Sequence, residues 1–288
     1  MAQALVVGLI TGGIYGLYAL GLVLVFKGSG VLNFAQAELG TFTLFICQSL
    51  VTQHGEPWIV GALAALVCAV AMGLVFERFA VWPLRAAPRL TVAVATIALL
   101  SLLIALELTI FGPLPRLLAP PVSGIGWRIF DVIVTPAQAM SLVLVLVIGL
   151  ALAAFLRFTD FGLAVVAAAQ DQEAVRFLGI RLARVSLFTW GLAAALSAVA
   201  ALLIQPTVGV VSASAFGGIF IKALGAALIG GLASMPGAFV GGVAVGVAEA
   251  EIRHLTLRSS LAGLPELCIF AAVVATLMVR PAGLLGER

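Results

Sequence analysis

Ionisable side chains inside long apolar segments are the first candidates for chemistry in this sequence. Glu107 stands among Ala105, Leu106 and Leu108, and Lys222, one of only two lysines, lies in a later apolar segment. Placing an ionised group in lipid is costly, so such a residue usually serves a function or faces an opposite charge. We therefore hypothesise a Glu107–Lys222 ion pair and count both residues among the polar groups of a path for solute.

A second polar group lies where the apolar segment near residues 34–52 begins. Asn33 there is able to cap a helix through its side-chain oxygen, and Glu38 lies in the first turn, where the helix dipole favours a carboxylate. A structural role at this helix start and a role along the path both remain open. Glu249 and Glu251, near the end of a later apolar segment, are interpreted as interfacial.

Motifs for covalent or metal chemistry are missing from the sequence. There is no G-x-x-x-x-G-K-[ST] phosphate loop, and His54 and His254 belong to no HExxH motif. Cys47, Cys68 and Cys268 lie in apolar runs without CxxC spacing, which is typical of buried apolar side chains. We expect no enzyme activity, no catalytic residue, no cofactor and no metal, so energy for any transport must come from another chain.

The composition indicates which elements must position these residues. Hydrophobic residues make up 63% of the chain and charged residues 9%, and the mean hydropathy is +1.26. A soluble domain needs about 25% charged residues to form its solvated surface. In lipid, an open chain satisfies its backbone hydrogen bonds as helices. The prediction is one all-α, polytopic helical bundle over residues 1–288, integral to a membrane.

Apolar runs separated by short breaks predict about eight or nine membrane spans. The candidates lie near residues 4–26, 34–52, 57–79, 91–111, 136–157, 185–205, 217–233, 237–250 and 262–279. The first run has no basic residue before it and is too long for a signal peptide, so we expect it to remain in the protein. The two glycine-rich runs between 217 and 250 are short, so either is a candidate half-span or re-entrant segment.

Basic residues predict the orientation of these spans. They cluster in two connections, at Arg78, Arg85 and Arg89 and at Arg157, Arg176, Arg181 and Arg184. Connections rich in arginine and lysine tend to be cytoplasmic, so the N-terminus is expected outside and the C-terminus inside. This distribution also accounts for the net charge of +3 without a nucleic-acid partner. Arg253, His254 and Arg258 would fall outside, which fits the rule poorly.

Glycines recur at four-residue spacing in two of the predicted spans. Small residues on one helical face allow a neighbouring helix to approach closely. We assign this packing role to Gly8, Gly12 and Gly16, and to Gly237 and Gly241.

Residues 158–184 form a connection that is too long to be a simple turn. A short helix from about Gln172 is expected to end near Gly179, because glycine commonly follows a helix C-terminus. Apolar side chains here accompany charges of both signs, which favours protein docking over binding of lipid headgroups. A solvated connector without a partner is the alternative. The apolar residues are Ala174, Val175, Leu178 and Ile180, and the charged ones are Asp171, Glu173, Arg176, Arg181 and Arg184.

Three segments, taken in order, resemble the permeases of ATP-binding-cassette (ABC) importers for branched-chain amino acids, the LivH-type family. They are GGIYGLYALGLVLVFKGSGVLNFAQAELG (12–40), AAAQDQEAVRFLGI (167–180) and KALGAALIGGLASMPGAFVGG (222–242). The resemblance covers nearly the whole chain and implies a type II-like importer permease. It also implies that residues 158–184 dock in a groove of a cytoplasmic ATPase. The ATPase-coupling residues implied are Asp171, Glu173, Ala174, Arg176, Gly179 and Ile180. Such permeases often have arginine where this chain has Val165 and Val166.

The same resemblance implies the partners and the location. The expected partners are a second, related permease subunit, two cytoplasmic ATP-binding subunits and a periplasmic or lipid-anchored solute-binding protein. The expected location is a bacterial inner membrane, with lipid around the bundle. The implied substrates are leucine, isoleucine and valine, and urea or short amides are the alternative.

Two other classes of protein remain as alternatives. A self-sufficient channel or secondary transporter would commonly have ion-coupling carboxylates at mid-membrane and broken helices in matched halves. Only Glu107 lies well inside a span, and the two halves show no clear repeat. An intramembrane enzyme would need a nucleophile–base pair or paired carboxylates, and none is evident.

Overall fold

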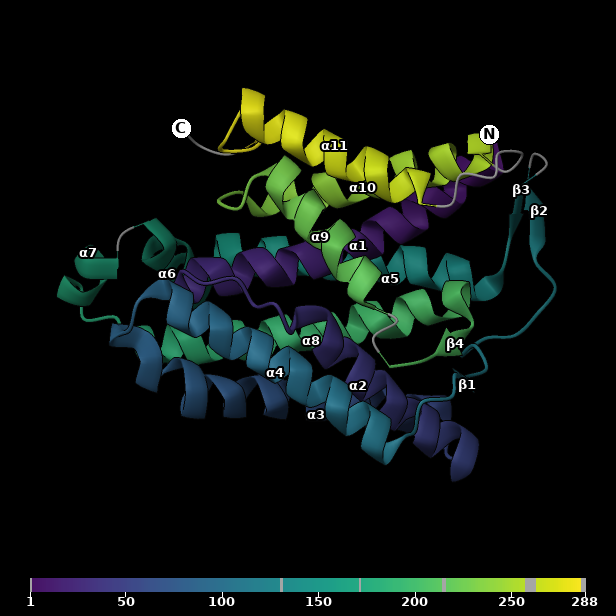
Figure 1. Ribbon diagram of the computed structural model, residues 1–288, viewed down its shortest axis with the longest axis horizontal. Helices are drawn as coiled ribbons and strands as arrows, with labels where there is room; N and C mark the ends of the chain where they lie inside the picture. The colour runs from purple at the N-terminus through teal and green to yellow at the C-terminus, as the bar shows by residue number, and fades with distance from the viewer. Residues whose placement is uncertain (1, 130–131, 171, 214–215, 257–262, 286–288) are drawn as a thin grey trace.

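The computed structural model describes residues 2–129, 132–170, 172–213, 216–256 and 263–285. These residues form a bundle of mostly apolar helices (Figure 1). The helices are α1 (Ala2–Ser29), α2 (Gln36–Gln48), α3 (Trp58–Phe76), α4 (Arg89–Ile110), α5 (Pro136–Phe158), α6 (Asp160–Gln170), α7 (Gln172–Phe177), α8 (Leu182–Val208), α9 (Gly217–Gly230), α10 (Met235–Thr256) and α11 (Leu264–Val279).

Each of the nine predicted spans coincides with a helix, and six of these helices are long and apolar enough to cross a membrane. One-turn π-helices extend α2 (Ser49–Gln53) and α3 (Glu77–Val81), and a 3₁₀ turn (Pro83–Ala86) precedes α4. The run predicted at 237–250 is not a half-span, because α10 has 22 residues. By contrast, α9 has only 14 residues. The all-α class is confirmed.

Short strands occur only at the right-hand end of the described bundle in Figure 1. Strand β2 (Trp127–Ile129) pairs with β3 (Val132–Val134), and β1 (Arg116–Leu117) pairs with β4 (Val210–Val211), both antiparallel. The N-terminus lies at this end, whereas α6, α7 and the C-terminus lie at the opposite end.

Two short helices, α2 and α9, begin in the middle of the bundle instead of at one of its ends (Figure 1). Each follows a long helix, α1 or α8, after which the chain turns back. The turns use Gly30 (φ 72°) and Gly209 (φ 79°), a left-handed conformation that glycine adopts at little cost. Helices α1 and α8 run in opposite directions, so the pair α1–α2 and the pair α8–α9 enter the bundle from opposite ends.

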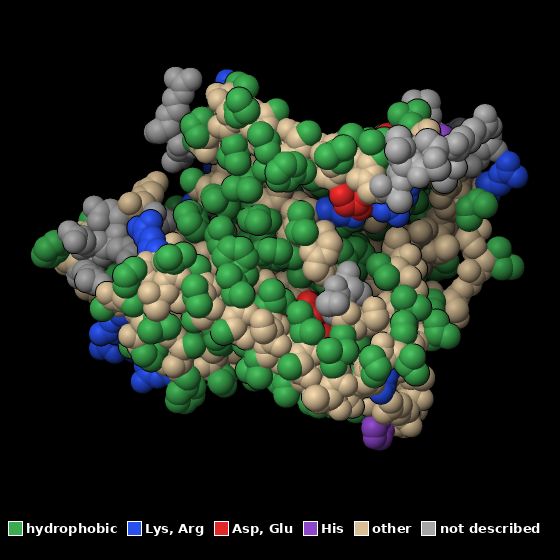
Figure 2. All heavy atoms as spheres, in the orientation of Figure 1, with side chains coloured by type: hydrophobic (Ala, Val, Ile, Leu, Met, Phe, Trp, Pro, Cys, Tyr) green, Lys and Arg blue, Asp and Glu red, His purple; other side chains and the backbone are tan. Residues whose placement is uncertain are grey.

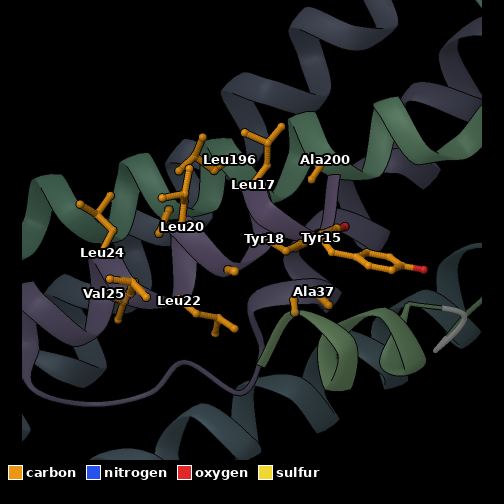
Figure 3. Packing of buried hydrophobic residues seen from close by; sticks show 14 of the residues in the cluster. Tyr15, Leu17, Tyr18, Leu20, Leu22, Leu24, Val25, Ala37, Leu196 and Ala200 are labelled. Atoms are coloured by element: carbon orange, nitrogen blue, oxygen red, sulfur yellow. The ribbon is translucent and has the colours of Figure 1, made fainter. Parts of the chain in front are cut away.

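Helix α1 is the central element of the bundle. Leu17, Tyr18 and Leu24 are fully buried, and α1 packs against α5, α8, α9 and α10 (Figure 3). The outer helices α3, α4 and α5 leave most of their apolar side chains exposed or half-buried. Such surfaces suit lipid or another apolar protein surface, not water.

Glycines bring α1 and α10 into backbone contact. A methyl group built on Gly8 or Gly12 would come within 2.8 Å of a Cα atom of α10, and one on Gly16 would meet the ring of Phe239. From the other side, a methyl group on Gly242 or Gly246 would collide with the backbone of α1. Gly237 and Gly241 face the backbone of α9 instead. Helix α10 is thus held between α1 and α9 at distances that larger residues do not permit.

Candidate functional site

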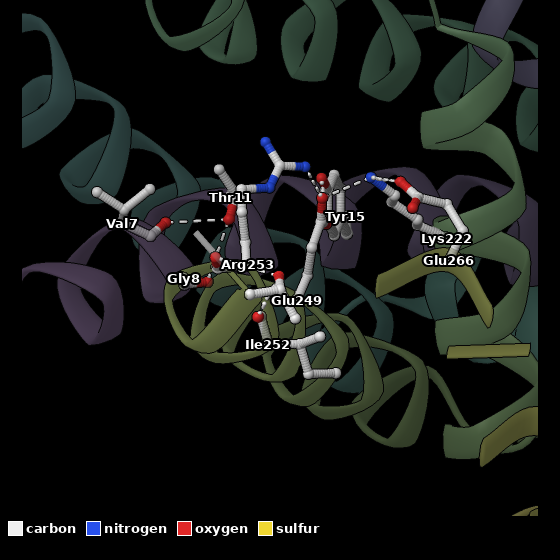
Figure 4. A network of polar contacts seen from close by, with 10 residues as sticks. Val7, Gly8, Thr11, Tyr15, Lys222, Glu249, Ile252, Arg253 and Glu266 are labelled. Carbon is white, nitrogen blue, oxygen red and sulfur yellow. Dashed lines mark hydrogen bonds and ion pairs between the residues drawn. The ribbon is translucent and has the colours of Figure 1, made fainter. Parts of the chain in front are cut away.

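A buried ion-pair network joins three helices of the bundle (Figure 4). The ammonium of Lys222 on α9 lies 2.6 Å from Oε1 of Glu249 on α10, and the Arg253 guanidinium lies 2.6 Å from the same oxygen. The hydroxyl of Tyr15 on α1 donates to Oε2 of Glu249 at 2.9 Å. Glu249, only 5% exposed, therefore has a partner for each carboxylate oxygen.

A fourth helix contributes a weaker interaction. Glu266 in the first turn of α11 lies 3.6 Å from the Lys222 ammonium, and its side chain is 56% exposed. Lys222 therefore links α9 to both α10 and α11, but the buried partner is Glu249. A buried charge requires such compensation because desolvation without a partner costs several kcal/mol, by order of magnitude.

The structure corrects two expectations about these charges. Lys222 pairs with Glu249 and Glu266, not with Glu107, which is buried on α4. Glu249, expected at the interface, is buried inside the bundle, because α10 continues to Thr256 and encloses it against α1 and α9. Sequence spacing missed this pair because its two residues are 27 positions apart on different helices. The available signal was Arg253, which stands one helical turn after Glu249.

A cavity of about 430 Å³ opens beside the network, and we call it the mixed-charge cavity. Its walls are partly apolar, and it also receives the end of α8 (Thr207, Val208) and the start of α9 (Gly218). A helix C-terminus carries partial negative charge and a helix N-terminus partial positive charge. The lining residues are Val7, Thr11, Tyr15, Ile204, Thr207, Val208, Gly218, Ile219, Lys222, Glu249, Ala250 and Arg253.

The polar group at the start of α2 forms a separate buried cluster. The Asn33 carboxamide donates to Gln36 (3.1 Å) and accepts from the backbone N–H of Ala35 (3.0 Å). Gln36 in turn donates to the Ala193 carbonyl on α8 at 2.7 Å. Asn33 therefore orders the turn just before α2, without bonding to an N–H inside that helix. Glu38 is buried in the first turn of α2.

The segment 158–184 ends the bundle on the side opposite the N-terminus (Figure 1). The expected short helix is present as α7, and Gly179 follows it with a φ of 79°. Asp171 lies outside the described residues, as do the side chains of Glu173 and Arg176. Ala174 is exposed, whereas Ile180 packs against the core.

The apolar side chains of this segment point in two directions. Val175, one of the expected docking residues, is only 2% exposed. Phe177 (91% exposed) and Leu178 (77% exposed) project outward instead. Phe177 was missed, although its place in the last turn of a six-residue helix, beside Leu178, was the signal available.

An all-α bundle of membrane-length apolar helices, with a charged cavity among them and an exposed segment at one end, defines a polytopic membrane permease. The chain matches the family described as branched-chain amino acid transport system / permease component over residues 4–279, and it belongs to that family. It is therefore a multi-pass membrane protein and a permease component of a transport system.

Named relatives match over most of their length. The high-affinity branched-chain amino acid transport system permease protein LivH of Escherichia coli (strain K12) is 29% identical over 97% of this chain and 94% of its own. The permease protein BraD of Pseudomonas aeruginosa is 30% identical over 99% of this chain and 95% of its own. A probable LivH of Methanocaldococcus jannaschii is 26% identical over 94% of this chain and 88% of its own.

Among solved structures, PsaBC from Streptococcus pneumoniae in complex with Fab aligns with 95% of this chain and 89% of that chain. The TM-score is 0.49 and the sequence identity 13%.

Proposed function

We propose that this chain is the membrane-spanning permease subunit through which an ABC importer moves branched-chain amino acids, powered by ATP hydrolysis in separate subunits. The observation that carries this proposal is the full-length match to permeases named for that substrate class. The whole permease, not one fragment of it, is shared.

The mixed-charge cavity is the proposed part of the path that receives the amino acid. A free amino acid is a zwitterion, so its carboxylate suits Arg253, Lys222 and the start of α9. Its ammonium group suits the carbonyl end of α8 and Glu266, which lies beside the lining residue Lys222. Walls formed by Val7, Ile204 and Ile219 suit a branched apolar side chain. The cavity volume lies within the range of small-molecule sites. Asn33, Glu38 and Glu107 remain proposed polar groups of the surrounding bundle.

The segment 158–184 is the proposed coupling segment. Exposed Phe177 and Leu178 offer apolar contacts to an ATPase groove, because large exposed apolar side chains at one tip favour protein docking. Gly179 allows the chain to turn there, and Ile180 connects the tip to the core. By resemblance, Asp171, Glu173, Ala174 and Arg176 complete the contact.

The orientation and the partners follow from the same proposal. The end carrying α6, α7 and the C-terminus faces the cytoplasm and two ATP-binding subunits, and the N-terminus faces outward. A second permease subunit packs on part of the exposed apolar surface, and an external solute-binding protein delivers the substrate. Lipid covers the remaining apolar surface.

Uptake by the reconstituted importer tests the proposal. We expect vesicles containing this permease and its partner subunits to accumulate radiolabelled leucine only with ATP and a hydrolysis-competent ATPase. Unlabelled isoleucine and valine should compete, whereas urea should not. Competition by urea alone would assign the amide class instead. Uptake that continues without ATP would show a self-sufficient transporter and overturn the ABC assignment.

A further inference from the structure

A second cavity, which we call the basic cavity, lies at the end of the bundle that carries the coupling segment. Its volume is about 810 Å³. It is enclosed by the turn after α1, the connection between α3 and α4, and the start of α8. The lining residues are Gly28, Ser29, Gly30, Val31, Val81, Trp82, Arg85, Ala86, Ala87, Arg89, Val92, Ile180, Arg181, Leu182, Ala183 and Ser186.

The charge of this cavity is entirely positive among the residues that line it. Arg85, Arg89 and Arg181 come from two separate parts of the chain, and the described lining contains no carboxylate. Within the described ranges, no ion pair compensates any of the three guanidinium groups. Arg85 stacks on Trp82, with its guanidinium carbon 4.0 Å from the ring centre. Three converging guanidinium groups favour an anion with several oxygens, such as a phosphate ester.

The position of the cavity along the helices indicates a second property that its ligand must have, an apolar part beside the anionic group. It lies where α3 and its extension end at Val81, where α4 begins at Arg89 and where α8 begins at Leu182. In a membrane, this is the level of the lipid headgroups. Phe79 and Leu90, which flank the cavity in sequence, are both highly exposed apolar side chains. The surface therefore presents cations and, near them in the sequence, exposed apolar side chains. Figure 2 shows Lys and Arg side chains at this end of the molecule beside hydrophobic surface.

We propose that the basic cavity binds the headgroup of an anionic phospholipid, with the phosphate held by Arg85, Arg89 and Arg181. The acyl chains lie along the exposed apolar surface near Phe79 and Leu90. Basic pockets between membrane helices on the cytoplasmic side have the chemistry to bind such headgroups. The cavity volume lies within the range of small-molecule sites, so a headgroup with its glycerol has room in it, and an inorganic phosphate ion would leave most of it unfilled.

A ligand in the basic cavity would directly contact residues of the coupling segment. Ile180 and Arg181 line the cavity, and they follow immediately after Phe177–Gly179, the exposed tip and its turn. A bound lipid therefore contacts the residues from which the tip projects. In this proposal the anionic lipid holds Ile180 and Arg181, the residues from which the tip projects, in place.

Lipid binding by the purified permease tests the site directly. Native mass spectrometry would count bound lipids after addition of a phosphatidylglycerol or of a phosphatidylcholine with identical acyl chains. We expect at least tenfold tighter retention of phosphatidylglycerol. The R85Q/R89Q/R181Q variant should lose this preference. The control R78Q/R157Q/R184Q changes the charge by the same amount at exposed arginines outside the lining, and it should keep the preference.

Three results would overturn the proposal. These are equal loss of the preference in both triple variants, its retention in R85Q/R89Q/R181Q, and displacement of the lipid by millimolar inorganic phosphate. The last result would identify a site for a free anion. The single variant R89Q, checked for wild-type helicity and a monodisperse elution profile, keeps the test decisive if a triple variant fails to fold. It should weaken phosphatidylglycerol retention alone, and an unchanged preference in it would count against the site.

Discussion

The mixed-charge cavity and the basic cavity lie toward opposite ends of the same bundle, and α1 contributes to both. Val7 lines the first cavity and Gly28 the second, and 21 residues of helix separate them by about 30 Å. In the first cavity, Glu249 accompanies Lys222 and Arg253 in the lining, and Glu266 lies beside Lys222, 3.6 Å from its ammonium. In the second, three arginines line the wall without a carboxylate among the described lining residues.

This difference indicates which ligand each cavity suits. Compensated charges form a near-neutral site that a zwitterion is able to enter and leave, whereas an uncompensated basic site favours an anion. Burial also differs, because Lys222 and Glu249 are buried while the arginines of the basic cavity are exposed. Removing one partner of a buried pair is therefore expected to affect folding, and removing an exposed arginine is expected to affect binding only.

The largest effect is expected from Glu249→Ala. This change leaves the Lys222 ammonium buried with only the more exposed carboxylate of Glu266, so we expect a loss of about 3–5 kcal/mol in the free energy of unfolding. Unfolding of the purified permease in mixed micelles would measure it. The double variant K222M/E249A should recover part of the loss. An equal or greater loss in the double variant would show that the two charges are not coupled.

A smaller loss is expected from Gly242→Ala, which adds a methyl group where α10 meets the backbone of α1. Overpacking of this kind typically costs about 1–3 kcal/mol, and here it would also move Glu249 away from Tyr15. The matched control is Gly217→Ala on α9, where an added methyl group meets no atom within 4 Å. Equal stability of the two variants would contradict close packing of α1 and α10. The basic cavity should keep its lipid preference in both.

Much of this fold was predictable because apolar runs determine where helices cross a membrane. All nine predicted spans became helices, and the four-residue glycine spacing indicated which faces pack closely. The length of α10 was underestimated because its last two turns contain Glu249, Glu251 and Arg253, which resemble the end of a span. When one segment of sequence is considered alone, charged residues that pair with another helix are predicted to face solvent.

Contacts between distant segments were the part that sequence reasoning did not reach. Glu107 was predicted as the partner of Lys222 because the predicted spans contain few charged residues. The packing of α9 against α10 instead places the carboxylate of Glu249 beside Lys222. In the coupling segment, apolar character alone did not separate Val175, which is buried, from Phe177 and Leu178, which project outward. The return of the chain after Gly30 and Gly209, which creates α2 and α9, likewise depends on backbone conformation.

The third prediction concerns the coupling segment, where substitutions at exposed positions should affect transport and a substitution at a buried position should affect stability. Phe177→Ser and Leu178→Ser remove exposed side chains, so the permease should fold normally, while ATP-driven uptake should fall about tenfold through loss of apolar contacts with the ATPase. Val175→Ser at the buried position of the same segment should instead lower stability. Co-purification of the ATPase would locate the defect. Normal uptake in the Phe177 and Leu178 variants would remove these residues from the coupling contact.

The smallest effect on stability is expected from Glu266→Gln, which tests how the charge of Lys222 is divided between its two carboxylates. Glu266 is half exposed and lies 3.6 Å from the ammonium, so water screens the interaction, and the expected loss is below about 1 kcal/mol. Uptake of leucine should nevertheless slow, because the variant withdraws the exposed carboxylate proposed to receive the substrate's ammonium group. If Glu266→Gln destabilised the permease as much as Glu249→Ala, then α11, not α10, would supply the main compensation.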